Sequence, residues 1–148
     1  MTNKEVQNMK KYLKSYRALQ REVRLQRIRL SDLQRAIRLP GLHIYLGSPA
    51  ELQTKADRQQ KKILDGIAYA QERCREIEAL IDRTEGPSEY KTWTYRQILR
   101  LRYLDGLPML EIPPQLGYNE RHTRRLHREA LEAAAEACRK GVDPDEME

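Results

Sequence analysis

Apolar residues recur every seven positions along residues 9–37 of the chain. One set of positions holds Met9, Tyr16, Val23, Leu30 and Ile37, and the other holds Tyr12, Leu19 and Leu33, interrupted by Gln26. A repeat of this length puts a narrow apolar stripe on one side of a helix, which is typical of a helix that packs against another. The pattern predicts a long helix, and Thr2 and Glu5 have the spacing of a capping box at its start.

A second helix is predicted over residues 49–83. Ser48 is suited to cap it, Pro49 to occupy its first position and Glu51 to return the capping bond. The apolar stripe of this helix, in which Gln60 is the weak point, consists of Ala56, Ile63, Ile67, Ala70, Cys74, Ile77 and Ile81. Because the connection over residues 40–47 is short, we expect the two helices to form an antiparallel, coiled-coil-like hairpin.

Two helices alone would leave much of each stripe exposed. The sequence therefore predicts that a second copy of the chain covers the stripes in a homodimer or higher homo-oligomer, or that the C-terminal part of the chain covers them. The residues expected at the oligomer interface are Met9, Tyr16, Val23, Leu30, Ile37, Ile63, Ile67 and Ile77.

Residues 98–131 have the pattern of a helix-turn-helix. The first of its two short helices is marked by Ile112 and Leu116, which lie four apart. Thr123, Leu126, Ala130 and Leu131 form one stripe on the second. Gly117 permits the positive φ of a tight turn, and Asn119 is suited to cap a helix that begins near Glu120.

Two further features shape this part of the chain. A helix is expected before the motif, lined by Tyr90, Trp93, Ile98, Leu101, Tyr103 and Leu104 and stopped by Asp105-Gly106. Within the motif, Pro113 and Pro114 each lack a backbone N–H. They predict that its first helix is kinked or reduced to a turn.

The helix that begins near Glu120 carries many hydrogen-bond donors on its outward side. A recognition helix meets base edges near its N-terminal end, and arginine matches the two acceptors of guanine. The predicted base-reading residues are Glu120, Arg121, Arg124 and Arg125. Phosphate contacts are expected from Asn119, His122, Arg128 and Lys91.

The sequence thus predicts an all-α protein in four parts. A helical hairpin for oligomerisation spans residues 1–84, and a linker follows over residues 85–88. A helix-turn-helix domain of three to four helices spans residues 89–140, and residues 141–148 are expected to be an acidic, disordered tail.

The charge distribution favours a polyanionic partner. The net charge is +6, and the excess of basic over acidic residues is concentrated in two segments. Residues 1–39 contain 11 Lys or Arg against 3 Asp or Glu, and residues 87–140 contain 10 Lys or Arg against 7 Asp or Glu. Nucleic acid is the usual partner of such surfaces. The alternative is that these cations merely solvate exposed helix faces.

Other chemistry is not favoured by the sequence. Cys74 and Cys138 lack paired spacing and fall at apolar helical positions, so we expect buried free thiols. His43, His122 and His127 do not have the spacing of metal ligands. No phosphate loop, nucleophile elbow or catalytic carboxylate pair is recognisable, so no enzyme, metal or cofactor is predicted.

Two further expectations concern location and the aromatic residues. No stretch approaches the roughly 18 uncharged residues that a membrane span needs, so a cytoplasmic location without a membrane partner is expected. The tyrosines at helical core spacing are expected to pack rather than to stack on bases. They are Tyr12, Tyr16, Tyr90 and Tyr103.

The C-terminal half also carries a series of short motifs. They are Glu89-Tyr90, Leu101-Arg102-Tyr103, Glu111-Ile112, Leu116-Gly117-Tyr118, Arg121, Arg125-Leu126-His127 and Ala130-Leu131. Over about 45 residues this series resembles the fourth region of bacterial primary sigma factors. It resembles more closely the small phage and prophage regulators of the RinA and ArpU type, and the match is looser over the first 85 residues.

The resemblance implies a function. It implies a sequence-specific, DNA-binding transcriptional regulator, a phage or prophage late-gene activator that works with bacterial RNA polymerase on the nucleoid of the host cell. It also implies a structural role for Leu116 and Leu126. Two alternatives stay open at this point: a protein that binds polymerase or sigma factor without reading bases, and a DNA-packaging recognition subunit of the small-terminase type.

Overall fold

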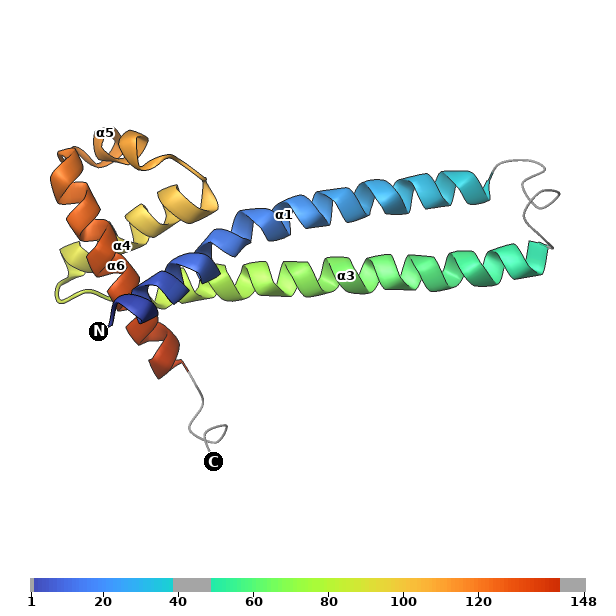
Figure 1. Ribbon diagram of the computed structural model, residues 1–148, viewed down its shortest axis with the longest axis horizontal. Helices are drawn as coiled ribbons and strands as arrows, with labels where there is room; N and C mark the ends of the chain where they lie inside the picture. Colours follow the sequence, from blue (N-terminus) through green and yellow to red (C-terminus); the bar gives the residue numbers. More distant parts are fainter. Residues whose placement is uncertain (1, 39–48, 142–148) are drawn as a thin grey trace, which may run out of the picture. The chain divides into compact units, whose positions relative to one another are not determined.

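All of the secondary structure in the described part of the chain is helical. The computed structural model describes residues 2–38 and 49–141, and these contain no strand (Figure 1). The elements are α1 (Asn3–Ile37), α3 (Pro49–Arg83), α4 (Glu89–Leu99), the π-helical turn η1 (Arg100–Leu104), the 3-10 turn η2 (Met109–Glu111), α5 (Ile112–Leu116) and α6 (Glu120–Lys140). The predicted all-α class is confirmed, and α3 has the predicted bounds. The predicted cap Ser48 and residues 142–148 lie outside the described residues.

The chain packs as two compact units. The first unit consists of Met1–Arg17 and Arg75–Glu148, and the second of Ala18–Cys74. The long helices α1 and α3 each contribute residues to both units. We describe each unit by itself.

The second unit is an antiparallel pair of helices. Val23 of α1 packs with Ile63, Ile67 and Ala70 of α3. Leu19, Leu30 and Leu33 are partly buried against this cluster. The two predicted stripes therefore face each other within one chain.

This pairing also places the residues that were predicted for an oligomer interface. Met9, Tyr16, Val23, Ile63, Ile67 and Ile77 are buried inside the single chain, Leu30 is partly buried, and Ile37 is 36% exposed. Within the described residues the single chain already buries most of these positions, so they do not need a second copy to cover them; the homo-oligomer itself stays a prediction. A homo-oligomer would need another surface.

The buried stripe of α1 changes its spacing near Tyr16. Val6, Met9, Leu13 and Tyr16 are buried in the first unit. Tyr16 follows Leu13 by three residues, and Leu19 in the second unit follows Tyr16 by three more. A seven-residue repeat alternates steps of three and four, so two successive steps of three interrupt it. The strict repeat therefore missed Leu13, which has no exposed surface, and predicted instead Tyr12, which is only partly buried.

Helix α6 buries one side in the first unit. Its buried residues are Thr123, Leu126, His127, Ala130, Leu131, Ala134 and Ala135. Helix α4 packs against it, and η2 and α5 pack near it. The predicted stripe of α6 is thus confirmed as the buried side of the helix.

The helix before the motif packs differently from the prediction. Its buried residues are Thr94, Tyr95, Ile98 and Leu99 in α4 and Tyr103 in η1. Tyr90 and Trp93 were expected in the core but are 61% and 53% exposed. Thr94 takes the buried side because its hydroxyl donates to the carbonyl of Tyr90 at 2.8 Å, which satisfies its polar atom locally.

The burial of the two cysteine thiols was predicted correctly for one of them. Cys74 is buried in the stripe of α3, whereas Cys138 is exposed. The expectation for Cys138 was wrong because the buried side of α6 ends at Ala135, one turn earlier.

Local capping chemistry agrees with the helix starts. Thr2 and Glu5 exchange the two bonds of a capping box, each 3.3 Å long. The hydroxyl of Ser88 accepts from the backbone N–H of Lys91 at 3.1 Å and caps α4. Helix starts could therefore be located from short sequence signals.

The proline pair lies in the first turn of α5. The helix has five residues, so the predicted reduction to a turn is confirmed. The backbone N–H groups of a first turn have no partner within the helix, so Pro113 and Pro114 remove no helical hydrogen bond there. Pro113 is buried, which makes it part of the packed core rather than a source of strain.

The packing of α1 generates a stability prediction. Leu13→Ala should lower the free energy of unfolding by roughly 2–5 kcal/mol, because it removes a fully buried side chain and leaves a cavity. Leu25→Ala on the same helix removes a side chain that is 50% exposed and should change the free energy of unfolding by less than about 0.5 kcal/mol. Urea unfolding followed by circular dichroism measures both, and equal effects would contradict the assigned buried side of α1.

Candidate nucleic-acid interface

The segment from α5 to the start of α6 is held by short-range contacts. Gly117 ends α5 with φ +76°, and its N–H donates to the carbonyl of Pro113 at 2.9 Å. The side chain of Asn119 accepts from the N–H of His122 at 2.7 Å, and Thr123 Oγ1 donates to the carbonyl of Asn119 at 2.9 Å. These bonds set the first residue of α6 at Glu120, as the sequence predicts.

The exposed positions in the first turns of α6 include the predicted base-reading residues. All are exposed, together with one predicted phosphate contact: Glu120, Arg121, Arg124, Arg125 and Arg128. Arg121, Arg125 and Arg128 lie away from the buried stripe, whereas Glu120 and Arg124, seven residues before buried His127 and Leu131, lie at its edge.

Several of these cations have local partners. Arg124 pairs with Glu120 at 2.6 Å, and Arg128 contacts Glu132 at 3.4 Å. Both pairs are on the surface, where an ion pair contributes about 0–1 kcal/mol. A phosphate or a base edge could therefore replace either partner at small cost.

A hollow of about 410 Å³ opens at the N-terminal end of α6. It is lined by Asn119, Arg121, His122 and Arg125. Arg125 Nη2 lies 2.7 Å from Nδ1 of His122, and the His122 ring meets the ring of Tyr118 edge-on at 4.9 Å. Two arginines next to free N–H groups at a helix start favour an anion such as a phosphate group.

The hollow brings together residues that the sequence had divided between two roles. Asn119 and His122 were predicted to contact phosphate, whereas Arg121 and Arg125 were predicted to read bases. Lys91, another predicted phosphate contact, does not line the hollow. It belongs to α4, where its ammonium group lies 3.5 Å from the carboxylate of Glu129.

A buried polar pair lies beneath the exposed face of α6. The hydroxyl of Tyr103 is 2.8 Å from Nε2 of His127, and the two rings stack at 5.7 Å. Burial, together with the smaller effects of the charges of Lys10, Arg102 and Lys14, lowers the pKa of His127 to about 4. Burial also raises the pKa of Tyr103 to about 12.

The sequence analysis missed this pair. His127 follows Thr123 by four residues, so the predicted stripe already placed it near the buried side. The partner Tyr103 comes from another element, and no local signal connects the two residues. At neutral pH His127 is uncharged, so it adds no cation beneath the arginine-rich surface.

A second hollow of about 660 Å³ lies beside α4. Its lining includes Gly86, Pro87, Trp93, Arg96, Gln97 and Arg100. Arg96 Nε donates to the carbonyl of Thr84 at 2.9 Å, and Arg100 pairs with Asp82. This hollow was missed because Trp93 was assigned to the core.

Among residues 2–38 and 49–141, no three His, Cys, Asp or Glu side chains are grouped so that they could bind a metal ion. No described helix combines the length and the apolar character that crossing a membrane requires.

Comparisons with protein-family models, curated proteins and solved structures gave no match. The functional argument therefore depends on the residues and contacts described above.

The buried histidine generates a prediction for pH dependence. Because the pKa of His127 is about 4 in the folded chain and about 6.5 in the unfolded chain, only the unfolded chain takes up this proton as the pH falls through that window. Between pH 7 and pH 4, the wild-type chain should lose about 3 kcal/mol more unfolding free energy than His127→Gln, which has no proton to bind. Urea unfolding across this pH range measures the difference. Parallel pH profiles would show that the pKa of His127 is the same in the folded and the unfolded chain.

Proposed function

We propose that this protein is a sequence-specific DNA-binding transcriptional regulator. In this proposal, η2, α5 and α6 form a helix-turn-helix in which α6 enters the major groove. The observation that carries the proposal is the arrangement of α6. Asn119 defines its start, one side of the helix is buried in the first unit, and its exposed positions carry arginines. That arrangement is what a recognition helix needs.

The dimensions and chemistry of α6 support this role. A helix with its side chains is about 10–12 Å across, and the major groove is about 12 Å wide. Arg124 lies on the second turn of α6, and its guanidinium pairs at the surface with the neighbouring Glu120. Two parallel N–H donors of such a group match O6 and N7 of guanine.

The hollow at the N-terminal end of α6 supports separate roles for the residues around it, some binding phosphate and others reading bases. We assign Arg121, with Asn119 and His122, to a DNA phosphate at the edge of the groove. Arg124 and Arg125 are assigned to base edges, with Arg125 near enough to the hollow to contact either. Phosphate contacts position a protein on DNA, and base contacts give it sequence preference.

The biological setting is part of the same proposal. The sequence resemblance favours a phage or prophage late-gene activator that contacts bacterial RNA polymerase on the nucleoid. A homo-oligomer fits DNA sites with two half-sites, but it has to use a surface other than the buried stripes of α1 and α3.

Binding titrations test the role of the arginines. After selection of a preferred duplex, Arg124→Ala/Arg125→Ala should lower the ratio of specific to random affinity by at least 5-fold and up to several hundred-fold, since a bidentate contact to a base discriminates by about 1–3 kcal/mol. Arg128→Ala should weaken both duplexes alike and lower the salt slope by about one.

The control is Arg58→Ala, which removes an exposed arginine from α3 in the second unit. It should leave the ratio and the salt slope unchanged. A double variant that keeps the wild-type ratio would show that this side of α6 does not read bases, and wild-type protein that selects no sequence would refute the proposal.

The hollow beside α4 favours a second candidate function. Trp93 lines this hollow, and both Trp93 and Tyr90, three residues earlier on α4, expose more than half of their surface. Exposed tryptophan and tyrosine are common energetic centres of protein interfaces. We therefore also propose that α4 binds a protein partner, of which RNA polymerase or its sigma factor is the candidate that the sequence suggests.

Substitutions on α4 separate this candidate from DNA binding. Tyr90→Ala/Trp93→Ala should weaken binding to immobilised RNA polymerase holoenzyme by at least 10-fold, because it removes two large contact residues, and should leave duplex affinity unchanged. Leu110→Ala, which changes another exposed apolar residue of the first unit, is the control. Equal polymerase binding by all three proteins would refute the second candidate.

A further inference from the structure

Three lysines cluster on the part of α1 that belongs to the first unit. Lys10, Lys11 and Lys14 lie within five residues, and Lys11 and Lys14 are exposed while Lys10 is partly buried. None of them forms an ion pair with a residue that the structure describes. We call these three residues the α1 lysine cluster.

Specific contacts hold this part of α1 next to α6 and η1. Arg128 Nη2 donates to Oδ1 of Asn3 at 3.1 Å, and Arg139 lies 3.6 Å from the carboxylate of Glu5. Further along, Arg17 Nη1 donates to the carbonyl of Asp105 at 3.0 Å. The cluster lies between these anchors along α1, so its position relative to α6 is defined.

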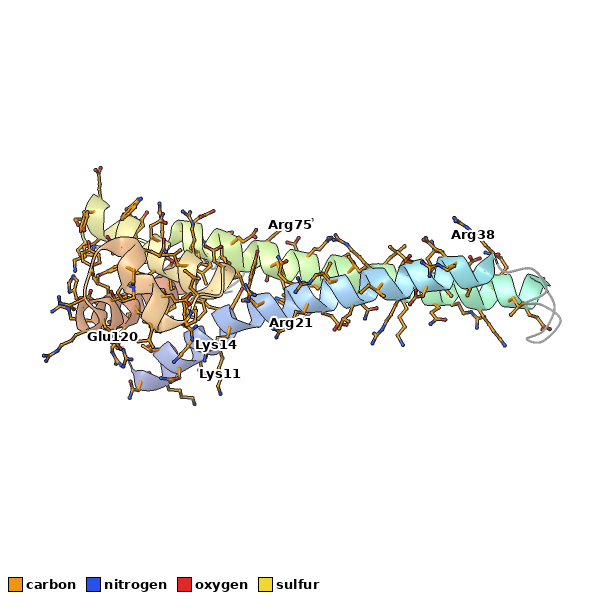
Figure 2. The ribbon with its side chains drawn as sticks, turned by 90° about the horizontal axis from the view of Figure 1, so that it is seen from above. Lys11, Lys14, Arg21, Arg38, Arg75 and Glu120 are labelled. Atoms are coloured by element: carbon orange, nitrogen blue, oxygen red, sulfur yellow. The ribbon has the colours of Figure 1, made fainter. Side chains whose placement is uncertain are left out.

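The cluster extends the positive surface of α6. Lys10 and Lys14 are near enough to His127 for their charges to act on it, and His127 lies between Arg124 and Arg128 in the sequence of α6. Figure 2 shows Lys11 and Lys14 on the same side of the first unit as Glu120, the first residue of α6. DNA that lies along α6 would therefore pass near the cluster.

Three arginines of this surface have acidic partners, whereas the lysines of the α1 lysine cluster do not have one among the described residues. Glu120, Glu132 and Glu5 accompany Arg124, Arg128 and Arg139, respectively. The lysines have no such partner among the described residues and repel one another. A row of phosphate groups would relieve that repulsion and release bound counterions.

We infer that the α1 lysine cluster is a second DNA contact, which binds the phosphate backbone beside the groove that α6 enters. The inference rests on the proposed function. Lysine suits this role because its ammonium is a mobile point charge, which binds phosphate without the planar geometry that base reading requires. The first turns of α1 would thus belong to the DNA-binding surface as well as to the helical hairpin.

The test replaces the cluster by glutamines, in Lys10→Gln/Lys11→Gln/Lys14→Gln. Each lost phosphate contact should lower the salt slope by about 0.9, so we expect a fall of about 2–3. Near physiological salt, affinity for the selected duplex and for a random duplex should fall by the same factor, on the order of 10- to 100-fold. The ratio between the two affinities should not change, because phosphate contacts carry no sequence preference.

A matched control removes the same charge from the second unit. Lys55, Lys61 and Lys62 are three exposed lysines of α3, and Lys55→Gln/Lys61→Gln/Lys62→Gln should leave the salt slope unchanged. Circular dichroism and urea unfolding confirm that both triple variants are folded, which is expected because glutamine and lysine have similar helix propensity.

The outcomes separate this inference from the proposed function. Equal losses in both triple variants would show that total charge acts rather than the cluster. An unchanged salt slope in the cluster variant, together with lost specificity in Arg124→Ala/Arg125→Ala, would refute the inference and support the proposed function. Loss of binding to single-stranded RNA but not to duplex would assign the cluster to RNA, and no duplex binding by wild-type protein would refute both.

Discussion

The burial of one side of α6 is the constraint on which the first unit depends. Leu126 and Leu131 supply apolar volume, while Ala130 and Ala134 are small enough to let neighbouring helices approach closely. Helix α4 packs on α6, and the first turns of α1 are tied to it through Arg128. Because one side of α6 is committed to the core, the side chains on the other side have a defined direction. A recognition surface needs this rigidity, since a misplaced guanidinium does not match a base edge.

Features with local causes were predictable from the sequence. The bounds of α3, the capping box of α1 and the start of α6 at Glu120 each follow from a few neighbouring residues. The pairing of the α1 and α3 stripes followed from their periodicity and from the short connection. The exposed positions of α6 could also be predicted, because a helix start and a buried stripe together define which residues face outward.

Features that depend on distant residues were not predictable in this way. The strict seven-residue repeat assumed one helical partner for α1, but its first turns belong to the first unit, where Leu13 rather than Tyr12 is fully buried. The apolar pattern placed Trp93 in the core because it could not show that Thr94 satisfies its own hydroxyl. The pairing of Tyr103 with His127 joins two elements, so neither residue carries a local sign of it. Residue types predicted the set of candidate DNA contacts, whereas their grouping around the hollow required the fold.

The electrostatics of the first unit follow from what is buried beneath its cations. Arg124 and Arg128 belong to the same helix as His127, and Lys10 and Lys14 of α1 act on that histidine through their charges. A protonated His127 would add a positive charge beneath this surface, without water to screen it. Burial keeps the ring neutral, and the hydroxyl of Tyr103 satisfies its polar nitrogen. The only electrostatic cost of gathering these cations is therefore their mutual repulsion at the surface. Salt screens this repulsion, and an anionic partner would remove it.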